Sequence, residues 1–393
     1  MIIYIILLLL ILFASVIFKP NGSRKGKKYF IVFVFGAIYL LNALRSPLVG
    51  IDLNEYYAPH FAQFAQIPWN NLQSVTISGD WELGFCAFCK LLTYISTDTQ
   101  FFIAVSSAII VLPYGYFIYK NCDDAVFGTF FYVAYNLMFS NMNTIRQAMA
   151  VSIVIMGLGA LRDKKYLKYT IFVLVAVLFH KSALIALVLV FVDKIRLTPN
   201  RLVFLLVLLA AIPVTYSVLF SYLLQIPFLS DSYDIYKSGM HAVGYFNWNS
   251  LIQFVVPFAV LMLACIYTKP WKMDEDTLQR PKKFTISGGK IFISKVPNEE
   301  YLWSDSIVGF AVYMAAMFRF FVFFVFVVGR LSQFFVPFIM IAFPRALIMM
   351  NNTKARRLTK YGMYCILLVY FLYIGFTSGG ASYGTVPYVF FNN

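Results

Sequence analysis

The residues best suited to chemistry are a few polar side chains that interrupt apolar sequence. His180 and Lys181 lie side by side in "FHKSAL", between two long apolar stretches. A Lys at the centre of a membrane helix costs about 2.5–3.5 kcal/mol on insertion scales, so something must offset that cost. Arg146 is a second case, because it opens an apolar helix at the end where the helix dipole disfavours a cation. We therefore expect His180 and Arg146 to have a functional role.

The composition places these residues in a membrane protein. Hydrophobic residues make up 61% of the 393 residues, whereas a soluble domain has about 45–50% apolar residues. The formal net charge of +15 comes from short basic runs between apolar segments, as the positive-inside rule expects of cytoplasmic loops. The charge therefore does not indicate nucleic-acid binding, and we interpret residues 1–393 as a single polytopic membrane domain.

The sequence predicts an all-α protein with about ten full transmembrane helices, because it contains apolar segments of about 20 residues. The Lys and Arg residues that flank these segments orient them and place both termini outside. Residues 45–98 and 225–249 are expected to be outer loops, and residues 269–303 a cytoplasmic loop. Leu83–Ile95 is too short to span and is interpreted as a re-entrant or interfacial helix, while the Gly-Gly of "KFTISGGKIFIS" favours a small β-hairpin. The predicted spans are Ile2–Phe18, Tyr29–Leu44, Phe101–Tyr119, Ala125–Ser140, the helix beginning within Asn141–Gln147, Leu202–Leu224, Leu251–Thr268, Ser306–Val328, Leu331–Met350 and Tyr361–Phe376.

The segment around "HKS" is predicted to be a re-entrant helical hairpin. It has about 12 apolar residues on each side, and at about 1.5 Å per residue each arm covers little more than half of a hydrocarbon core of about 30 Å. Both flanks, "RDKKYLKY" and "DKIRLTPNR", are basic and therefore cytoplasmic. A chain that enters, turns at His180 and returns satisfies both flanks. The break is expected to be buried in protein or to face a water-filled cavity.

With this topology, a set of polar residues falls on or just below the outer face. Arginine suits bidentate recognition of phosphate in a partly dry site, and a carboxylate or His among them could act as a general base. The set predicts a site for a phosphate-bearing amphiphile, and the polar, aromatic outer loops would suit a sugar. Arg319, in mid-segment, is interpreted as a snorkelling anchor instead. The candidate residues are Arg45, Asp52, Tyr56, Glu82, Arg146, Gln147, His180, Lys181 and Arg330.

Several short motifs, in order along nearly the whole chain, resemble the EpsG family of bacterial polysaccharide proteins, which belongs with the Wzy-type polymerases. They are "RSPLVGIDLNEYY", "WELGF", "IRQAMA", "HKSAL", "GRLSQFF" and a near-terminal "PY" at Pro387 and Tyr388. The "KFTISGGKIFIS" segment is not part of the resemblance.

The resemblance implies a reaction at the outer face of the bacterial cytoplasmic membrane. Such polymerases transfer a growing glycan from undecaprenyl diphosphate to the non-reducing-end sugar of another lipid-linked repeat unit, and they resemble membrane glycosyltransferases of the GT-C type. Expected partners are this lipid-linked oligosaccharide, membrane lipid, a flippase and a chain-length regulator.

The resemblance and the residue types together suggest roles for the candidate residues. Arg45, Arg146, Lys181 and Arg330 would hold the diphosphate, and Tyr56 would position sugar or diphosphate. Asp52, Glu82 and His180 are the candidate bases, with Asp52 and His180 favoured. No metal or other cofactor is expected, because fixed cations can supply the charge stabilisation.

Two other functions stay open. A ligase that transfers a finished glycan, or another membrane transferase, would share the topology and the outer cations. A transporter or flippase of polysaccharide precursors is a different class, since a broken helix with polar groups at mid-depth also occurs in transporters. The products would separate them: a ladder of repeats for a polymerase, one addition for a ligase, and accumulation across a membrane for a transporter.

Overall fold

The computed structural model describes residues 1–75, 81–192, 247–267, 283–287, 290–294, 305–324, 326–378 and 383–392, together with residues 200, 204, 205, 207, 208 and 211. Within these ranges, five helices are long and apolar enough to cross a membrane, or up to six if one bent pair forms a single span. The predicted count of about ten full spans is not confirmed. The predicted span Leu202–Leu224 and the predicted outer loop 225–249 lie largely outside the described residues.

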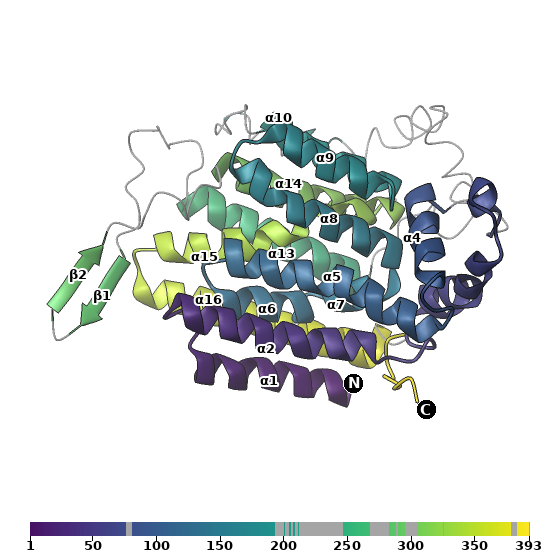
Figure 1. Ribbon diagram of the computed structural model, residues 1–393. Coiled ribbons are helices and arrows are strands. Elements are labelled where there is room, and N and C mark those ends of the chain that lie inside the picture. The colour runs from purple at the N-terminus through teal and green to yellow at the C-terminus, as the bar shows by residue number, and fades with distance from the viewer. Residues whose placement is uncertain are drawn as a thin grey trace.

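The long helices lie side by side in one bundle (Figure 1). Their packed faces share one large apolar core, to which Tyr4, Phe35, Tyr132 and Phe343 contribute buried rings. The long helices are α1 (Ile2–Phe18), α2 (Arg24–Ala43), α5 (Thr99–Asn121), α8 (Ile145–Arg162), α13 (Trp248–Tyr267), α14 (Asp305–Phe321), α15 (Ile339–Met349) and α16 (Thr353–Tyr373).

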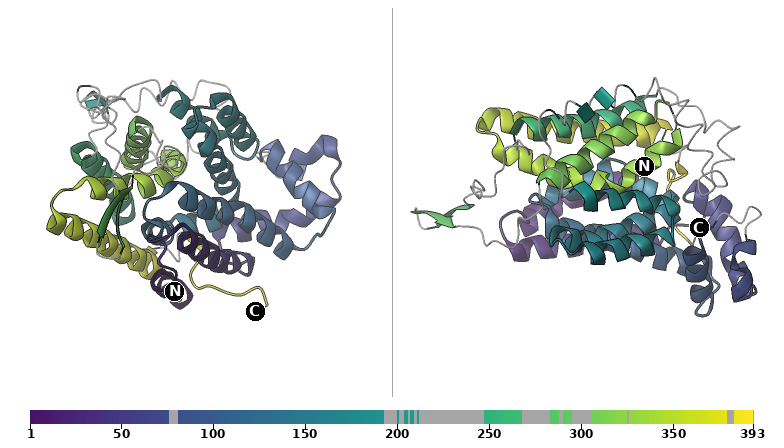
Figure 2. Two further views of the ribbon diagram at one scale, coloured as in Figure 1. Left: turned by 60° about the vertical axis from the view of Figure 1, so that its left-hand side comes forward. Right: turned by 90° about the horizontal axis from the view of Figure 1, so that it is seen from above.

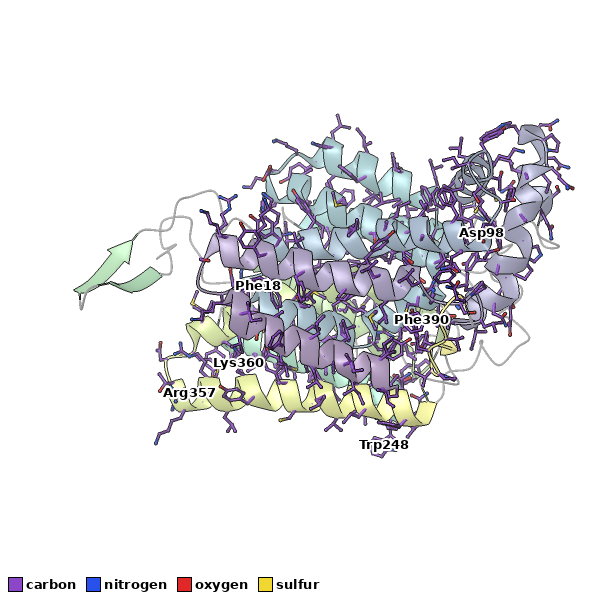
Figure 3. All side chains as sticks on the ribbon, turned by 60° about the horizontal axis from the view of Figure 1, so that its bottom comes forward. Phe18, Asp98, Trp248, Arg357, Lys360 and Phe390 are labelled. Atoms are coloured by element: carbon purple, nitrogen blue, oxygen red, sulfur yellow. The ribbon has the colours of Figure 1, made fainter. Side chains whose placement is uncertain are left out.

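The two ends of the bundle differ in character. Both chain termini lie at the end that carries the helix α4 (Leu83–Thr93), and the two-stranded hairpin lies at the opposite end (Figure 1). Figure 3 shows the same division, with Asp98 and Phe390 at one end and the basic residues Arg357 and Lys360 at the other. Among the described residues, both termini thus lie at one end of the bundle and the basic residues Arg357 and Lys360 at the other, and which end faces outside stays a prediction.

The hairpin predicted around Gly-Gly is confirmed. Strands β1 (Lys283–Ser287) and β2 (Lys290–Ser294) pair antiparallel, with Ile286 opposite Ile291.

The predicted span Ala125–Ser140 is not one helix. It is divided into α6 (Ala125–Ala134) and α7 (Leu137–Asn143) at Asn136, whose φ is 70°. A right-handed helix cannot continue through this left-handed conformation. All residues of α7 are buried, so the break inserts a short polar helix into the bundle just before α8 begins.

A second correction concerns the predicted spans Ser306–Val328 and Leu331–Met350. Helix α14 ends at Phe321, and the chain continues through the 3₁₀ segments η6 (Phe326–Phe334) and η7 (Val336–Phe338) before α15 begins. The helical pieces Val328–Phe334 and Val336–Met349 meet at an angle of 46°. Gly329 and Arg330 lie in η6, outside regular α-helix, and the main chain at Arg330 is hydrogen-bonded to Gln147 at the start of α8.

The chain turns back at "HKS", as predicted. Helix α9 (Tyr166–Val177) ends before the turn, and η4 (Lys181–Leu187) and α10 (Val188–Val192) follow it. The hydroxyl of Tyr169 donates a hydrogen bond to the carbonyl oxygen of Ala186 at 3.0 Å. A continuous helix would hold residues this far apart in sequence about 25 Å from each other, so the two arms must lie alongside. Re-entry into a membrane stays a prediction.

The first predicted outer loop is far more ordered than expected. Between α2 and α5 it forms a group of short helices at one end of the bundle (Figure 2). Their buried rings make a second apolar core with Phe102 of α5, including Tyr57, Phe61, Trp81 and Phe85. The predicted helix Leu83–Ile95 corresponds to α4. The described elements of this group are η1 (Leu53–Tyr57), α3 (Ala58–Phe61), η2 (Ala62–Ala65), η3 (Trp69–Val75) and α4.

A labelling experiment tests which side of the membrane each end occupies. Asp98 and Arg357 are exposed and lie at opposite ends of the bundle. In a Cys365→Ser background, which removes the one exposed thiol among the five cysteines, we expect Asp98→Cys to react with an impermeant maleimide in cells with an intact cytoplasmic membrane. Arg357→Cys should react only after permeabilisation. Labelling of both variants in intact cells, or the reverse pattern, would contradict the predicted orientation.

Candidate active site

The carboxylate of Glu82 joins three segments that are far apart in sequence. Glu82 is the residue before α4, and its side chain is 7% exposed. Its Oε2 lies 2.7 Å from Nη1 of Arg146, in the first turn of α8. Its Oε1 accepts hydrogen bonds from Nδ1 of His180 at 3.0 Å and from the main-chain N–H of Lys181 at 3.1 Å, both at the turn after α9. The structure thus brings together three of the predicted site residues.

Arg146 is held from several sides. Besides the ion pair, its Nε donates to the hydroxyl of Tyr57 at 3.4 Å, and its guanidinium carbon lies 5.8 Å from the centre of the Trp81 ring. A cation in the first turn of a helix is disfavoured by the helix dipole. The carboxylate of Glu82 offsets that cost directly, and a stacked arginine also gains from the aromatic face. The guanidinium is therefore fixed in position at the start of α8.

The "WELGF" motif docks α4 against the turn that carries His180. The N–H of Phe85 donates to the carbonyl oxygen of Leu178 at 3.2 Å. A Cβ on Gly84 would lie 2.5 Å from Cβ and 2.7 Å from the carbonyl oxygen of Leu178, closer than atoms can pack. Glycine at this position is thus required for the close approach that brings Glu82 to His180.

The electrostatics of Glu82 favour its charged form. Burial acts to raise its pKa, but the hydrogen bond from His180 and the positive charge of Arg146 outweigh burial and lower the pKa to about 2. Glu82 is therefore ionised at neutral pH, which makes it a weak base and a strong hydrogen-bond acceptor. An ionised carboxylate can only accept, so Nδ1 of His180 must carry a proton. The other ring nitrogen, Nε2, is then available as the proton acceptor of a neutral imidazole.

Asp52 lies beside this group, at the end of a turn that Gly50 makes possible. Gly50 has a φ of 112°, a conformation that strongly favours glycine. The N–H of Asp52 donates to Oδ1 of Asn143 in α7 at 2.9 Å. Burial raises the pKa of Asp52, and the charges of Arg330 and Arg146 offset part of that effect. Asp52 is thus a more basic carboxylate than Glu82 and stands as a second candidate base.

Gln147 and Arg330 connect α8 to the bend after α14. Nε2 of Gln147 donates to the main-chain carbonyl oxygen of Arg330 at 2.6 Å. The guanidinium of Arg330 has no hydrogen-bond or ion-pair partner among the residues that the structure describes, yet it is close enough to Asp52 and His180 to act electrostatically on both. Gln147 therefore positions the chain at Arg330, and the Arg330 guanidinium makes no direct hydrogen bond or ion pair with the described residues.

Arg45 lies elsewhere, beneath the C-terminal segment. It is 1% exposed, and its Nε and Nη1 have no hydrogen-bond partner. The N–H of the next residue, Ser46, donates to the carbonyl oxygen of Val389 at 2.9 Å, and the hydroxyl of Tyr388 donates to the carbonyl oxygen of Leu41 at 2.7 Å. The guanidinium is near the Tyr4 and Tyr388 rings rather than Glu82. Arg45 and the "PY" motif thus belong to the docking of the tail.

Two predicted residues, Tyr56 and Lys181, lie differently from what their expected roles suggest. Two partners of Arg146, Tyr57 and Trp81, were not predicted. The Tyr56 side chain is 54% exposed, and Lys181 meets Glu82 through its main chain. Tyr57 contacts Arg146 in place of Tyr56, and Trp81 stacks against it. A signal for Tyr57 exists in the sequence: Leu53, Tyr57 and Phe61 follow one another at helical spacing, which predicts that Tyr57, not Tyr56, faces the core.

Among the described residues, no three His, Cys, Asp or Glu side chains are grouped so that they could hold a metal ion. The expected independence of metal stays a prediction.

A match to a protein family shows how the chain is related to known proteins. A match to the EpsG family covers residues 28–390, nearly the whole chain. The chain belongs to the EpsG family. This is a family of Wzy-like polysaccharide polymerases, so the resemblance seen in the motifs is confirmed. No curated protein and no solved structure matches the chain, and similarity to the GT-C fold stays a prediction.

Five of the motifs that carry the EpsG resemblance each bring a residue to the neighbourhood of Glu82, whereas Arg45 and the "PY" motif lie at the C-terminal segment. "GID" supplies Asp52, "WELGF" supplies Glu82, "IRQ" supplies Arg146 and Gln147, "HKS" supplies His180, and "GR" supplies Arg330. The first four of these segments lie at a helix end or at a turn, and Gly329 and Arg330 lie within the 3₁₀ segment η6. The structure therefore gives these five motifs of the EpsG-family protein a common location.

The close approach at Gly84 can be tested with a matched pair of glycine variants. Gly84→Ala should destabilise the protein by about 1–3 kcal/mol, as overpacking does, and should lower activity by separating Glu82 from His180. Gly159→Ala is the control, because a Cβ there meets nothing within 4 Å. Thermal unfolding in detergent and an activity assay would measure both effects. Equal behaviour of the two variants would mean that the contact between Gly84 and Leu178 is not required.

Proposed function

We propose that this EpsG-family protein is a polysaccharide polymerase that acts at the outer face of the bacterial cytoplasmic membrane. Its substrates would be oligosaccharide repeat units carried on undecaprenyl diphosphate. The observation that carries the proposal is the carboxylate of Glu82 held between Arg146 and His180, with Arg330 and Asp52 beside it. Family membership supports polymerisation, and the position of this group at the end opposite the basic connections supports an outer-face site.

The proposed reaction moves the growing glycan from one lipid carrier to another repeat unit. A hydroxyl oxygen at the non-reducing end of the acceptor unit attacks the anomeric carbon of the donor glycan. The bond between that carbon and the diphosphate oxygen breaks, and undecaprenyl diphosphate leaves with the bonding electron pair. The hydroxyl proton passes to a base on the protein. The reaction needs no oxidant, reductant or nucleotide, because every bond that forms is matched by one that breaks.

The cations would serve the leaving group. Negative charge grows on the diphosphate as its bond breaks, and fixed positive groups in a partly dry site stabilise that charge without reorganising. Arg330 suits this role because its guanidinium has no described protein partner to neutralise it. Arg146 adds a second guanidinium, oriented by Glu82, Tyr57 and Trp81. These fixed positive charges can supply the charge stabilisation that a metal ion supplies in other transferases.

The base that we propose is Nε2 of His180. The bond from Nδ1 to Glu82 sets the tautomer and orientation of the ring, as a carboxylate does for a catalytic histidine. Glu82 would thus be a positioning residue for both Arg146 and His180. Asp52 is the alternative base, and substitution separates the two. Lys181, membrane lipid, a flippase and a chain-length regulator remain expected participants that follow from the resemblance.

The test is synthesis by the purified protein in lipid vesicles, supplied with a cognate repeat unit on undecaprenyl diphosphate and read as a glycolipid ladder on a gel. We expect a ladder from the wild type and losses of about 10²–10⁴-fold in rate for Arg146→Gln and His180→Gln. Arg162→Gln is the matched control, since Arg162 lies at the other end of α8 and pairs with Asp163. Asp52→Asn should retain more activity than His180→Gln.

The other outcomes identify other functions. A single addition to an acceptor would indicate a ligase, and transport of the glycolipid without any ladder would indicate a flippase. A full ladder from Arg146→Gln and from His180→Gln would mean that the Glu82 group is not part of the active site. Greater loss in Asp52→Asn than in His180→Gln would make Asp52 the base.

A further inference from the structure

A segment near the C-terminus, residues 383–392, lies on the turn that carries Asp52, and we call this segment the tail. The N–H of Gly50 donates to the carbonyl oxygen of Gly384 in the tail at 2.8 Å. Two residues further on, the N–H of Asp52 donates to Oδ1 of Asn143 in α7 at 2.9 Å. The main chain of residues 50–52 is therefore hydrogen-bonded both to the tail and to α7, and its position depends on both.

Gly384 fits this contact because it has no side chain. Its φ is 60°, in the left-handed region that favours glycine. A Cβ at this position would lie 2.9 Å from Cγ1 and 3.0 Å from the main-chain nitrogen of Ile51. Atoms do not pack this closely, so a side chain at position 384 would force the tail away from the turn.

The tail is fastened along its length to α1 and to the end of α2. Arg45 and Phe390 form an antiparallel β-bridge, and Thr385 is fully buried. Four hydrogen bonds support the bridge: the N–H of Ser46 to the carbonyl of Val389 (2.9 Å), the N–H of Phe391 to the carbonyl of Leu44 (3.1 Å), the hydroxyl of Tyr388 to the carbonyl of Leu41 (2.7 Å) and the hydroxyl of Tyr4 to the carbonyl of Thr385 (2.8 Å). The contact at Gly384 is thus one part of a continuous docking.

A compact turn connects the fastened part of the chain to Asp52. The carbonyl oxygen of Ser46 accepts the N–H of Val49 at 2.9 Å, and its hydroxyl accepts the N–H of Leu48 at 3.3 Å. Because hydrogen bonds close this turn, a displacement of the tail would be passed on to Asp52. Arg45 and the "PY" motif, both part of the tail docking, are connected to the candidate active site in this way.

We propose that the tail is a strap that positions the carboxylate of Asp52 in the candidate active site, with Gly384 and Tyr4 as positioning residues. The strap takes no part in the chemistry itself. Asp52 is close enough to Arg330 and Arg146 for their charges to act on it, so a shift of the turn would move the carboxylate relative to both guanidinium groups. The effect on the reaction rests on the proposed function, whereas the strap does not.

Hydrogen exchange of the full-length protein in detergent, read by mass spectrometry, tests the strap directly. Gly384→Ala should speed exchange at the N–H groups of Ser46 and Gly50 at least about tenfold, because local opening exposes them to water. Tyr4→Phe removes a hydroxyl that binds the tail, and it should act in the same direction even if the glycine variant does not fold. Gly362→Ala is the control, since a Cβ there meets nothing within 4 Å. Wild-type exchange in Tyr4→Phe and in folded Gly384→Ala would overturn the strap.

The rate of polymer synthesis tests the effect on Asp52. We expect Gly384→Ala to lower kcat about tenfold, because small misplacements of reacting groups are costly. In the Asp52→Asn background the same change should alter kcat by less than about twofold, since the carboxylate that the strap positions is already absent. A variant that only destabilises the protein would lower the rate by the same factor in both backgrounds, and that result would overturn the positioning role.

The two measurements separate this inference from the proposed function. If the wild type makes a glycolipid ladder but exchange is unchanged in Gly384→Ala and Tyr4→Phe, the strap is wrong and the proposed function stands. If exchange rises as expected but the wild type makes no ladder, the proposed function fails, and the strap is confirmed as a structural element without a role in this reaction.

Discussion

The structure depends on a buried carboxylate that is shared between the guanidinium of Arg146 and the imidazole of His180. Charges in an apolar surround are tolerated only when paired and hydrogen-bonded. Glu82 pairs with the charge of Arg146 and accepts a hydrogen bond from the neutral ring of His180. Removing one partner of such a group typically costs 3–5 kcal/mol, because the remaining charge stays buried. The start of α8, the turn after α9 and the start of α4 must therefore meet. Gly84 and the hydrogen bond from Phe85 to Leu178 are the local means by which they do.

The helix breaks follow from the same requirement. In an unbroken helix the main-chain groups are all used in helical hydrogen bonds. At a break, main-chain N–H and C=O groups become available beside the polar side chains at the same depth in the bundle. The chain breaks at Asn136, at His180 and at Phe335, directly after the 3₁₀ segment that carries Arg330. Asn143, Glu82 and Gln147 then connect these segments by hydrogen bonds. The group that results contains the guanidinium groups of Arg146 and Arg330, which suit an anionic substrate.

The chemistry-bearing residues could be predicted from the sequence better than the architecture could. Arg146, Glu82 and His180 are unusual in apolar surroundings, and the basic flanks of "HKS" predict the turn that the bond from Tyr169 to Ala186 confirms. The break at Asn136 could not be predicted, since apolar residues continue through it and tertiary packing decides the conformation. Tyr57 was missed because the choice between adjacent tyrosines depends on which face of a short helix is buried. The hydrogen bond from Arg319 to Gln253 of α13 could not be predicted either, because the two residues are distant in sequence.

The most direct test of the central claim is a double-mutant cycle between Glu82 and Arg146, measured as the initial rate of polymer synthesis in vesicles. If Glu82 acts by positioning Arg146 and His180, Glu82→Gln and Arg146→Gln should each lower the rate, and the double variant should lose little more than the worse of the two. Residues that form one unit are coupled by about 0.5–3 kcal/mol in such cycles. Losses that multiply, so that the double variant falls by the product of the single effects, would contradict the account, because the two residues would then act independently.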